Sequence, residues 1–416
     1  MGLKGSIRVP SDKSITHRAF LFGAVAKGKT VVRNPLLGED CRSTIQAIES
    51  LGASVVEQGE TFVIEGTEQL TSARLDCGNS GTTMRLLAGL VAGYEGEFQL
   101  TGDDSLSKRP MKRVTVPLRE MGAQIEGDFA PMTIHGRALQ AIDYTLPIAS
   151  AQVKSALLLA GLRASGVTTI HEPMLSRDHT ERMLPMFGAD LTVEEGQDGR
   201  FIRVAPGVLR GTEVDVPADP SSAAFLWAGA AIVPDSDVTT TDVCLNETRI
   251  GFLRTLQRMG ADVTIENERK LGEETVGDVT VRTSRLQGTT VEGPMIPSQI
   301  DELPLFALVA SQASTPSVVR DAAELRVKET DRIKTVVQEL GVLGVDLEET
   351  EDGFIVKPST IQEGKVQSHG DHRLSMMLQV ARLLSKGWIE IEGIEASDIS
   401  YPQFHEDLQR LHREIE

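Results

Sequence analysis

Basic side chains gather in a few short polar segments of this sequence. Lys13 and Arg18 lie in SDKSITHR, Arg109 in SLSKRPMKR, Arg332 in LRVKETDRIK and Arg373 in GDHR. The planar guanidinium of arginine binds a carboxylate or phosphate through two parallel hydrogen bonds. The whole chain carries 42 Lys+Arg against 60 Asp+Glu, a net charge of −18. Basic clusters in an acidic protein predict a positive site for a small ligand with several negative charges.

Two carboxylates and a glycine-rich turn occupy similar segments. Asp301 lies in IDELP and Glu329 in KETDR, and a carboxylate within hydrogen-bond reach of a substrate can transfer a proton. GNSGTTMR places Asn79 and Gly81 at an expected helix start, where free N–H groups favour anions and glycine permits close approach. These residues predict an enzyme or binding protein for phosphorylated, carboxylated small molecules.

Simpler explanations apply to each segment taken by itself. Ser, Asp and Asn are preferred helix N-caps, and ADPSS at 218–222 needs no other role. Lys328 and Arg332 have the i,i+4 spacing of a solvated helix face. The functional interpretation therefore depends on the equivalent positions that the segments occupy in a repeat.

Two helical patterns alternate along the chain about every 70 residues. One helix opens from a polar loop and is rich in Ala and Leu; the other is amphipathic and ends in a Gly turn before strand residues. The first pattern is marked by Ser11, Asn79, Ser150, Ser221, Asp301 and Asp371. The second is marked by the turn glycines Gly52, Gly122, Gly188, Gly260 and Gly341, because glycine supplies a left-handed helix cap.

Six copies of an α/β unit follow from these patterns. The chain stops within its sixth copy and begins with a matching fragment, so we expect its two ends to complete one domain. We expect two similar three-unit domains, residues 14–213 and residues 1–13 plus 214–416, with two crossings between them. Ligand sites prefer domain interfaces.

Composition excludes several functional classes. The charge of −18 and the 4% aromatic content oppose nucleic-acid binding, and no apolar run is long enough to span a bilayer. The three cysteines, Cys41, Cys77 and Cys244, lack metal-ligand spacing and fit a reduced compartment. We expect a cytoplasmic protein with no signal peptide and no membrane or nucleic-acid partner.

The polar segments resemble those of the EPSP synthase (3-phosphoshikimate 1-carboxyvinyltransferase) family. GNSGTTMR and LRVKETDRIK are the most specific, and SKRP, SAQ, IDELP and GDHR occur in the family's order. The resemblance runs from PSDKSITHR to SYPQF. It implies an α/β (α+β) fold of two domains, each an inside-out barrel of three βαβαββ units, with the active site in the cleft between them.

The same resemblance implies the reaction. The enolpyruvyl group of phosphoenolpyruvate is transferred to the 5-hydroxyl of shikimate 3-phosphate, and phosphate is released without a metal or organic cofactor. We expect a monomer that is inhibited by glyphosate.

Site roles follow from the resemblance position by position. Asp301 is implied to accept the 5-hydroxyl proton, Glu329 to protonate the methylene carbon, and Lys13 to contact both substrates during catalysis. The implied ligands of shikimate 3-phosphate are Lys13, Ser14, Arg18, Ser150, Ala151, Gln152, Arg177, Asp301 and Lys328. The implied ligands of phosphoenolpyruvate are Lys13, Asn79, Gly81, Arg109, Gln152, Arg332 and Arg373.

The sequence departs from some family members. Ala151 stands where they have a second serine, and SRDHT replaces a loop with a tyrosine, so Arg177 is expected to supply a shikimate contact. SDISYP lacks the lysine that some members carry before the C-terminal aromatic-Pro motif.

Three alternatives remain beside this interpretation. UDP-N-acetylglucosamine 1-carboxyvinyltransferases share the donor but typically use a loop cysteine, and no cysteine lies in the candidate loop 103–113. RNA 3′-terminal phosphate cyclases have related repeats, which the net charge opposes. A non-catalytic anion-binding protein would need the same cations.

Overall fold

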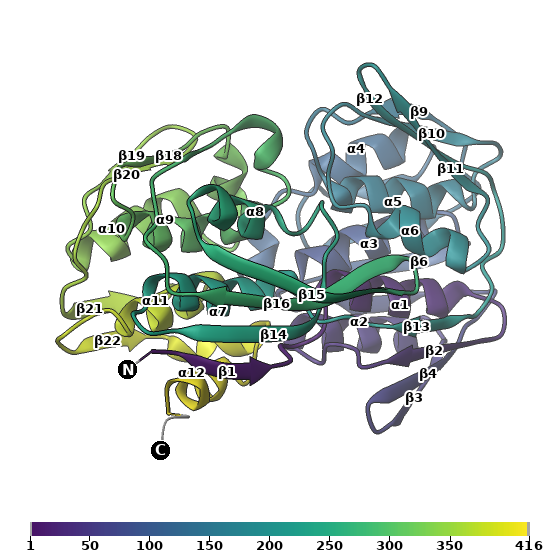
Figure 1. Cartoon of the computed structure of the whole chain (residues 1–416). Helices are drawn as coiled ribbons and strands as arrows, with labels where there is room; N and C mark the ends of the chain where they lie inside the picture. The colour runs from purple at the N-terminus through teal and green to yellow at the C-terminus, as the bar shows by residue number, and fades with distance from the viewer. Residues whose placement is uncertain (1, 414–416) are drawn as a thin grey trace. The chain divides into compact units, whose positions relative to one another are not determined.

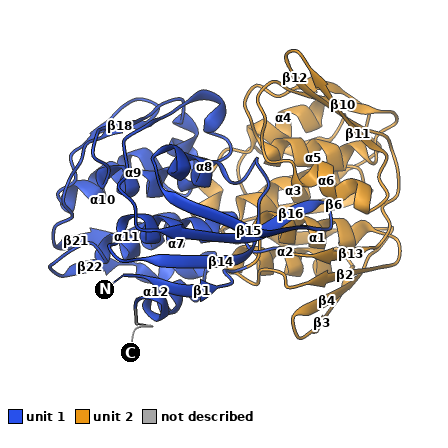
Figure 2. Ribbon diagram, in the orientation of Figure 1, with its two compact units in different colours: residues 1–10, 217–416 blue, residues 11–216 orange. Residues whose placement is uncertain are grey.

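The computed structural model describes residues 2–413 in two compact units (Figure 2). Unit 1 comprises Met1–Pro10 and Pro217–Glu416, and unit 2 comprises Ser11–Val216. The chain thus crosses between units three residues before the first expected boundary and three residues after the second. Residue 1 and residues 414–416, which the expected domain ranges include, lie outside the described residues.

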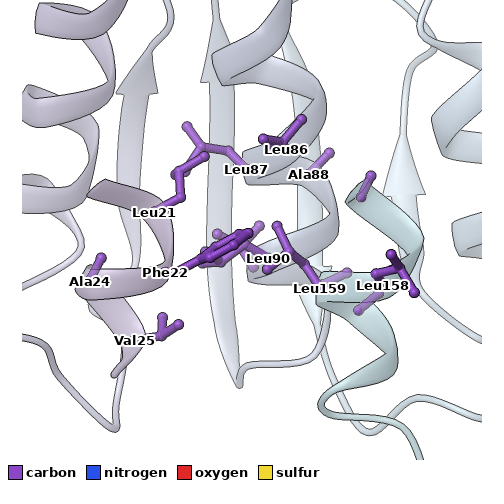
Figure 3. Packing of buried hydrophobic residues seen from close by; sticks show 14 of the residues in the cluster. Leu21, Phe22, Ala24, Val25, Leu86, Leu87, Ala88, Leu90, Leu158 and Leu159 are labelled. Carbon is purple, nitrogen blue, oxygen red and sulfur yellow. The ribbon is translucent and has the colours of Figure 1, made fainter. Parts of the chain in front are cut away.

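Each unit is built around three helices that are buried on nearly all sides. In unit 2 they are α1 (Lys13–Val25), α3 (Gly81–Ala92) and α5 (Ala151–Gly161); in unit 1 they are α7 (Pro220–Ile232), α9 (Leu303–Ser311) and α11 (His372–Arg382). Figure 3 shows Leu21 and Phe22 of α1, Leu90 of α3 and Leu158 and Leu159 of α5 in one apolar cluster. Their Ala/Leu-rich composition follows from this burial.

A second helix in each copy buries one face only. These helices are α2 (Glu39–Ser50), α4 (Lys112–Glu120), α6 (His179–Met186), α8 (Gly251–Arg258), α10 (Arg332–Val342) and α12 (Phe404–Arg413). In α2, for example, Cys41, Thr44 and Ile48 are buried at i, i+3 and i+7, the spacing of a one-sided helix. Among residues 2–413, no helix combines the length and apolar character needed to cross a lipid bilayer.

Within the described residues, five four-stranded sheets share one topology. Across each sheet, the first strand is parallel to the second, and the second and third and the third and fourth strands are antiparallel. Unit 2 contains three of these sheets. The strand order in the first is β5 (Ala73–Asp76), β6 (Gly96–Thr101), β8 (Met132–Gly136) and β7 (Gln124–Glu126), and in the second it is β9 (Asp143–Thr145), β10 (Thr168–Glu172), β12 (Gly199–Val204) and β11 (Leu191–Gly196). In the third it is β13 (Glu213–Asp215), β2 (Lys29–Arg33), β4 (Thr61–Glu65) and β3 (Ser54–Gln58). Unit 1 contains β1 (Lys4–Ile7), β14 (Asp237–Cys244), β16 (Glu274–Arg282) and β15 (Asp262–Leu271); and β17 (Thr290–Val291), β18 (Ser317–Val319), β20 (Phe354–Val356) and β19 (Leu347–Glu349).

Two of these sheets take their first strand from a distant part of the chain. In unit 1, β1 pairs with β14, and in unit 2, β13 pairs with β2. The N-terminal strand therefore completes the sheet of the fourth copy, although α12 of the last copy also contacts β1 (Figure 1). The sixth sheet has two strands within the described residues, β21 (Gly364–Gln367) and β22 (Ile389–Glu392).

One expected turn glycine is wrong. Gly52, Gly122, Gly188 and Gly260 adopt positive φ angles, but Gly341 lies inside α10. Gly344, with φ of +82°, makes the turn instead. The segment LGVLG offers two glycines three residues apart, and the helix ends between them, at Val342.

Candidate functional site

The expected ligand residues of unit 2 lie at the starts of its three buried helices. Asp12, Ser80 and Ser150 cap these helices, accepting hydrogen bonds from first-turn N–H groups at 2.9, 3.1 and 3.4 Å. Capping therefore accounts for part of each polar segment. It leaves the neighbouring side chains, such as that of Asn79, for other contacts.

Lys13 is the first residue of α1, and its side chain stays partly exposed. Its Nζ lies 3.0 Å from Oδ2 of Asp40, the second residue of α2. The side chain of Lys13 keeps 20% of its surface exposed, and that of Asp40 keeps 11%. The ammonium thus retains access to a ligand while a carboxylate holds it.

Arg18 lies one turn later and is buried. Its guanidinium donates to the carbonyl of Ser14 at 2.9 Å, to Oγ1 of Thr180 at 2.7 Å and to Oγ of Ser155 at 2.8 Å. Helices α1, α5 and α6 therefore hold this cation together. These three hydrogen bonds fix the orientation of the guanidinium, which can bind an anion.

Arg109 follows the short 3-10 helix η1 (Leu106–Lys108) and is oriented by Asn79. Its Nη2 donates to Oδ1 of Asn79 at 2.8 Å, while Nδ2 of Asn79 donates to Asp103 at 2.6 Å. Asn79 was expected to contact phosphoenolpyruvate. Its amide accepts from Arg109 on one side and donates to Asp103 on the other, so Asn79 orients Arg109.

Gly81, the first residue of α3, borders a guanidinium that the sequence-based site did not include. A Cβ at Gly81 would lie 2.6 Å from Nη1 of Arg85 and 3.6 Å from Nη1 of Arg109. The same Nη1 of Arg85 donates to Oε1 of Gln152 at 2.9 Å, and Nε2 of Gln152 donates to Thr82 at 2.9 Å. Gly81, Arg85 and Gln152 form one packed group.

The remaining expected residues of unit 2 are partly exposed. Ser150 caps α5, and Ala151 is the first residue of that helix. Arg177 lies in the loop between β10 and α6.

The expected residues of unit 1 converge on Arg332, the first residue of α10. Oδ1 of Asp301, in the 3-10 helix η3 (Ile300–Glu302), lies 3.4 Å from Nη1 of Arg332 and 3.7 Å from Nζ of Lys328. Oε2 of Glu329 lies 2.7 Å from Nη2 of Arg332. Both candidate proton-transfer groups therefore contact the same guanidinium.

Arg332 is only 1% exposed. Asp371, the N-cap of α11, binds its Nε at 2.8 Å and its Nη2 at 3.2 Å. Burial by itself would lower the pKa of Arg332, but the carboxylates of Asp371, Glu329 and Asp301 outweigh it and raise the pKa. The guanidinium is therefore permanently charged.

Arg373 lies in the first turn of α11 and is buried. Its Nη1 donates to the carbonyl of Ser221 at 3.2 Å and lies 4.0 Å from Oε1 of Glu302. Arg332 is thus placed by the start of a one-sided helix, α10, and Arg373 by the start of a buried helix, α11.

Sequence reasoning missed the partners that hold these cations. Arg85 was recognised in the segment GNSGTTMR, four residues after Gly81 and on the same helix face, but no ligand role was assigned to it. Asp371 was recognised only as a marker of its copy. Asp40 carries no signal, because its pairing with Lys13 exists only when α1 and α2 pack together.

The comparisons with known proteins are consistent with this arrangement. The family model of EPSP synthase (3-phosphoshikimate 1-carboxyvinyltransferase) matches residues 1–408. The chain belongs to the EPSP synthase family. This membership confirms the resemblance and favours it over the UDP-N-acetylglucosamine enzymes.

Individual members of the EPSP synthase family are similar over their whole length. The 3-phosphoshikimate 1-carboxyvinyltransferase of Geobacillus kaustophilus is 51% identical, over 98% of each chain. That of Bacillus cytotoxicus is 49% identical, over 99% of this chain and 98% of the relative.

Solved structures confirm the fold. EPSP synthase from Acinetobacter baumannii has a TM-score of 0.85 and 43% identity, covering 99% of this chain and 96% of that one. The enolpyruvyl transferase NikO from Streptomyces tendae, at 17% identity, has a TM-score of 0.81 over 99% and 95% of the chains, and shows the fold alone. The chain has the two-domain inside-out α/β fold.

Proposed function

We propose that this protein is a transferase that converts phosphoenolpyruvate and shikimate 3-phosphate into 5-enolpyruvylshikimate 3-phosphate and phosphate. The reaction belongs to the shikimate pathway, which leads to chorismate and aromatic amino acids. The observation that carries the proposal is membership of the EPSP synthase family over nearly the whole chain. The cations and carboxylates of its specific segments support it.

Shikimate 3-phosphate is assigned to residues that offer cations, hydroxyls and amides. Arg18 supports this role most directly, because three neutral oxygens preorganise its guanidinium and preorganisation reduces the free energy lost on binding. The proposed ligands are Lys13, Ser14, Arg18, Ser150, Ala151, Gln152, Arg177, Asp301 and Lys328.

Phosphoenolpyruvate is assigned to a second set that includes three arginines. Arg109 suits the phosphate, and Arg332 and Arg373 suit the carboxylate, because a guanidinium fork matches both groups. The proposed ligands are Lys13, Asn79, Gly81, Arg109, Gln152, Arg332 and Arg373.

The chemistry requires a base and an acid. Asp301 accepts the proton of the 5-hydroxyl while the oxygen of that hydroxyl forms a bond to C2 of phosphoenolpyruvate. Glu329 delivers a proton to C3. The product of this addition is a tetrahedral intermediate that still carries phosphate. Loss of phosphate from C2 and of a proton from C3 then restores the double bond, and nearby cations stabilise the leaving group.

Glu329 must be protonated to act as the acid, and its contact with Arg332 opposes this. A proton donor must be protonated, whereas the side chain lies 2.7 Å from a guanidinium that favours a carboxylate. We expect the carboxylate of phosphoenolpyruvate to replace Glu329 as a partner of Arg332. Substrate binding would then release Glu329 to take up and deliver the proton.

The enzyme is further proposed to work as a cytoplasmic monomer that glyphosate inhibits by competing with phosphoenolpyruvate. The family resemblance is the basis for these three points. Sedimentation velocity tests the monomer, and inhibition kinetics test the competition.

The decisive experiment is phosphate release from phosphoenolpyruvate in the presence of shikimate 3-phosphate, with UDP-N-acetylglucosamine as the alternative acceptor. We expect release only with shikimate 3-phosphate. Lys13→Met should abolish it, while Lys27→Met, which removes an exposed lysine of the same unit, should not. Release with UDP-N-acetylglucosamine alone would overturn the proposal, and so would the absence of release with either acceptor.

A further inference from the structure

Unit 2 contains a buried lysine that has no part in the roles proposed above. Lys154, on α5, has no exposed surface. Its Nζ lies 2.9 and 3.0 Å from the two carboxylate oxygens of Glu172 and 2.6 Å from Oε1 of Glu181. Burial by itself would lower the pKa of Lys154, but the two carboxylates outweigh it and raise the pKa, so the side chain is an ammonium.

Stability is a weak explanation for such a cluster. Removing three charged groups from water is unfavourable, and well-packed apolar residues often replace a buried ion cluster without loss of stability. A more specific explanation is what the cluster holds in place.

One carboxylate of the cluster anchors the loop that carries Arg177. Glu172 is the last residue of β10, and its Oε1 accepts hydrogen bonds from the backbone N–H of Ser176, at 3.0 Å, and from the hydroxyl of Ser176. Ser176 immediately precedes Arg177. Lys154 contacts both oxygens of Glu172 and therefore fixes the carboxylate to which Ser176 of this loop is hydrogen-bonded.

The other carboxylate anchors the first turn of α6. Glu181 follows Thr180, whose Oγ1 accepts from Nε of Arg18 at 2.7 Å and lies 2.6 Å from Oγ of Ser155. Ser155 in turn follows Lys154 on α5. The cluster thus adjoins both hydroxyls that orient the guanidinium of Arg18.

We propose that Lys154 is a positioning residue for the binding of shikimate 3-phosphate, which it controls by setting the orientations of Arg18 and Arg177. The inference rests on the proposed function, because both arginines are assigned there to this substrate. Lys154 acts through its two glutamates and touches neither substrate.

The test is Lys154→Met, which keeps an unbranched apolar side chain one atom shorter and removes the charge. Wild-type turnover with both substrates is measured first, so that failure of the proposed function is recognised separately. We expect the KM for shikimate 3-phosphate to rise on the order of 10-fold, as for one weakened hydrogen bond to a charged group. The KM for phosphoenolpyruvate, at saturating shikimate 3-phosphate, should change less than about 2-fold.

Arg119→Met is the matched control. It breaks an ion pair between Arg119 and Asp128 in the same unit but touches no proposed ligand, so both KM values should stay at wild-type levels. If Lys154→Met lowers the melting temperature and leaves both KM values unchanged, or raises both equally, the cluster is only structural and the proposal is overturned.

Two milder variants decide the question if Lys154→Met does not fold. Ser176→Ala removes the hydroxyl contact to Glu172, and Thr180→Val replaces the hydroxyl that accepts from Arg18 with a methyl group of similar size. A selective rise in the KM for shikimate 3-phosphate in both supports the proposal. Wild-type KM values in both overturn it, as does a rise in only the KM for phosphoenolpyruvate.

Discussion

Arg332 illustrates how single residues in this protein are placed by opposite charges. A buried guanidinium without partners would be highly unfavourable, and here Asp371, Asp301 and Glu329 surround it. The two groups proposed for proton transfer therefore also stabilise the charge of a proposed ligand. Substitutions at these positions will affect chemistry and stability together, and each test must separate them.

Asp301→Asn should lose turnover far more than substrate affinity. The amide keeps the size of the side chain but cannot accept the proton of the 5-hydroxyl, and loss of a general base costs on the order of 10²–10⁴-fold in rate. Turnover is compared with the Kd for shikimate 3-phosphate from calorimetry. Asp346→Asn, which alters an exposed pair with Lys357, is the control. A variant with wild-type turnover would remove Asp301 from the mechanism.

Gly81→Ala should raise the inhibition constant of glyphosate more than the KM for phosphoenolpyruvate. The new Cβ would lie 2.6 Å from Nη1 of Arg85, so this guanidinium must move, and the longer inhibitor tolerates a narrowed pocket less well. Overpacking costs about 1–3 kcal/mol, or roughly 5- to 150-fold in affinity. Equal rises in both constants would show that the methyl group does not discriminate between the two molecules.

At the scale of elements, a buried chain of hydrogen bonds joins the starts of three helices of unit 2. Nδ1 of His17 in α1 lies 2.7 Å from the hydroxyl of Thr44 in α2, which lies 2.7 Å from that of Thr83 in α3. Thr83 donates to Ser80, the cap of α3, at 2.7 Å. These hydrogen bonds explain why polar residues interrupt otherwise apolar helices.

Because these hydrogen bonds include the buried His17, we expect the protein to lose stability in mild acid. Burial, the largest cause, lowers the pKa of His17 from 6.5 to about 3, so the unfolded chain takes up a proton first as the pH falls. The stability contributed by neutral His17 is complete above pH 6.5 and is lost progressively towards pH 3, by about 2 kcal/mol at pH 5. Urea unfolding at pH 7.5 and pH 5 should show this loss in wild type and not in His17→Asn.

His405→Gln, which replaces an exposed histidine, should lose as much stability in acid as wild type. If His17→Asn does the same, protonation of His17 is not the cause.

The turn after α10 distinguishes two glycines of one sequence segment. Gly341 lies within the helix, with nothing within 4 Å of an added Cβ, so Gly341→Ala should stabilise unit 1 by about 0.5–1 kcal/mol. Gly344 has a φ of +82°, and its Cβ would lie 2.7 Å from Gln362. Gly344→Ala should therefore destabilise unit 1 by at least about 1–2 kcal/mol. Thermal unfolding of the two variants would contradict the assignment if the order of stability were reversed.

At the scale of the whole molecule, each unit completes one of its sheets with a short strand that is distant in sequence from its partner strand. Ile7, in β1, belongs to the core of unit 1, and Val214, in β13, belongs to the core of unit 2. Residues far apart in sequence therefore complete each core. Unit 1 therefore needs two separate segments of the chain to assemble all of its sheets, whereas unit 2 is the one continuous segment Ser11–Val216.

Ile7→Asp and Val214→Asp should weaken different units. Each variant buries an uncompensated carboxylate, at a cost of about 3–5 kcal/mol. We expect amide hydrogen exchange to accelerate in β14 and β16 for Ile7→Asp, and in β2 and β4 for Val214→Asp. Each variant is the control for the other. Faster exchange in the same strands for both variants would contradict the assignment of β1 to unit 1 and of β13 to unit 2.

Local patterns in the sequence were sufficient to predict the repeat, the fold class and the segments that carry the cations. Helical periodicity, Ala/Leu-rich helices and recurring polar helix starts depend on neighbours within a few residues, so they are legible in the sequence. The shared topology of the five four-stranded sheets and the family match confirm the repeat and the fold class.

The tertiary structure alone decided which residues meet. The pairing of β1 with β14, of Lys13 with Asp40 and of Lys154 with Glu172 joins positions 18 to 233 residues apart. Gly344 rather than Gly341 makes the turn, because α10 continues to Val342 and the positive φ falls on Gly344. Such contacts depend on the packing of whole helices and strands. Packing alone sets the distance between two residues that are far apart in sequence, so local sequence spacing does not predict it.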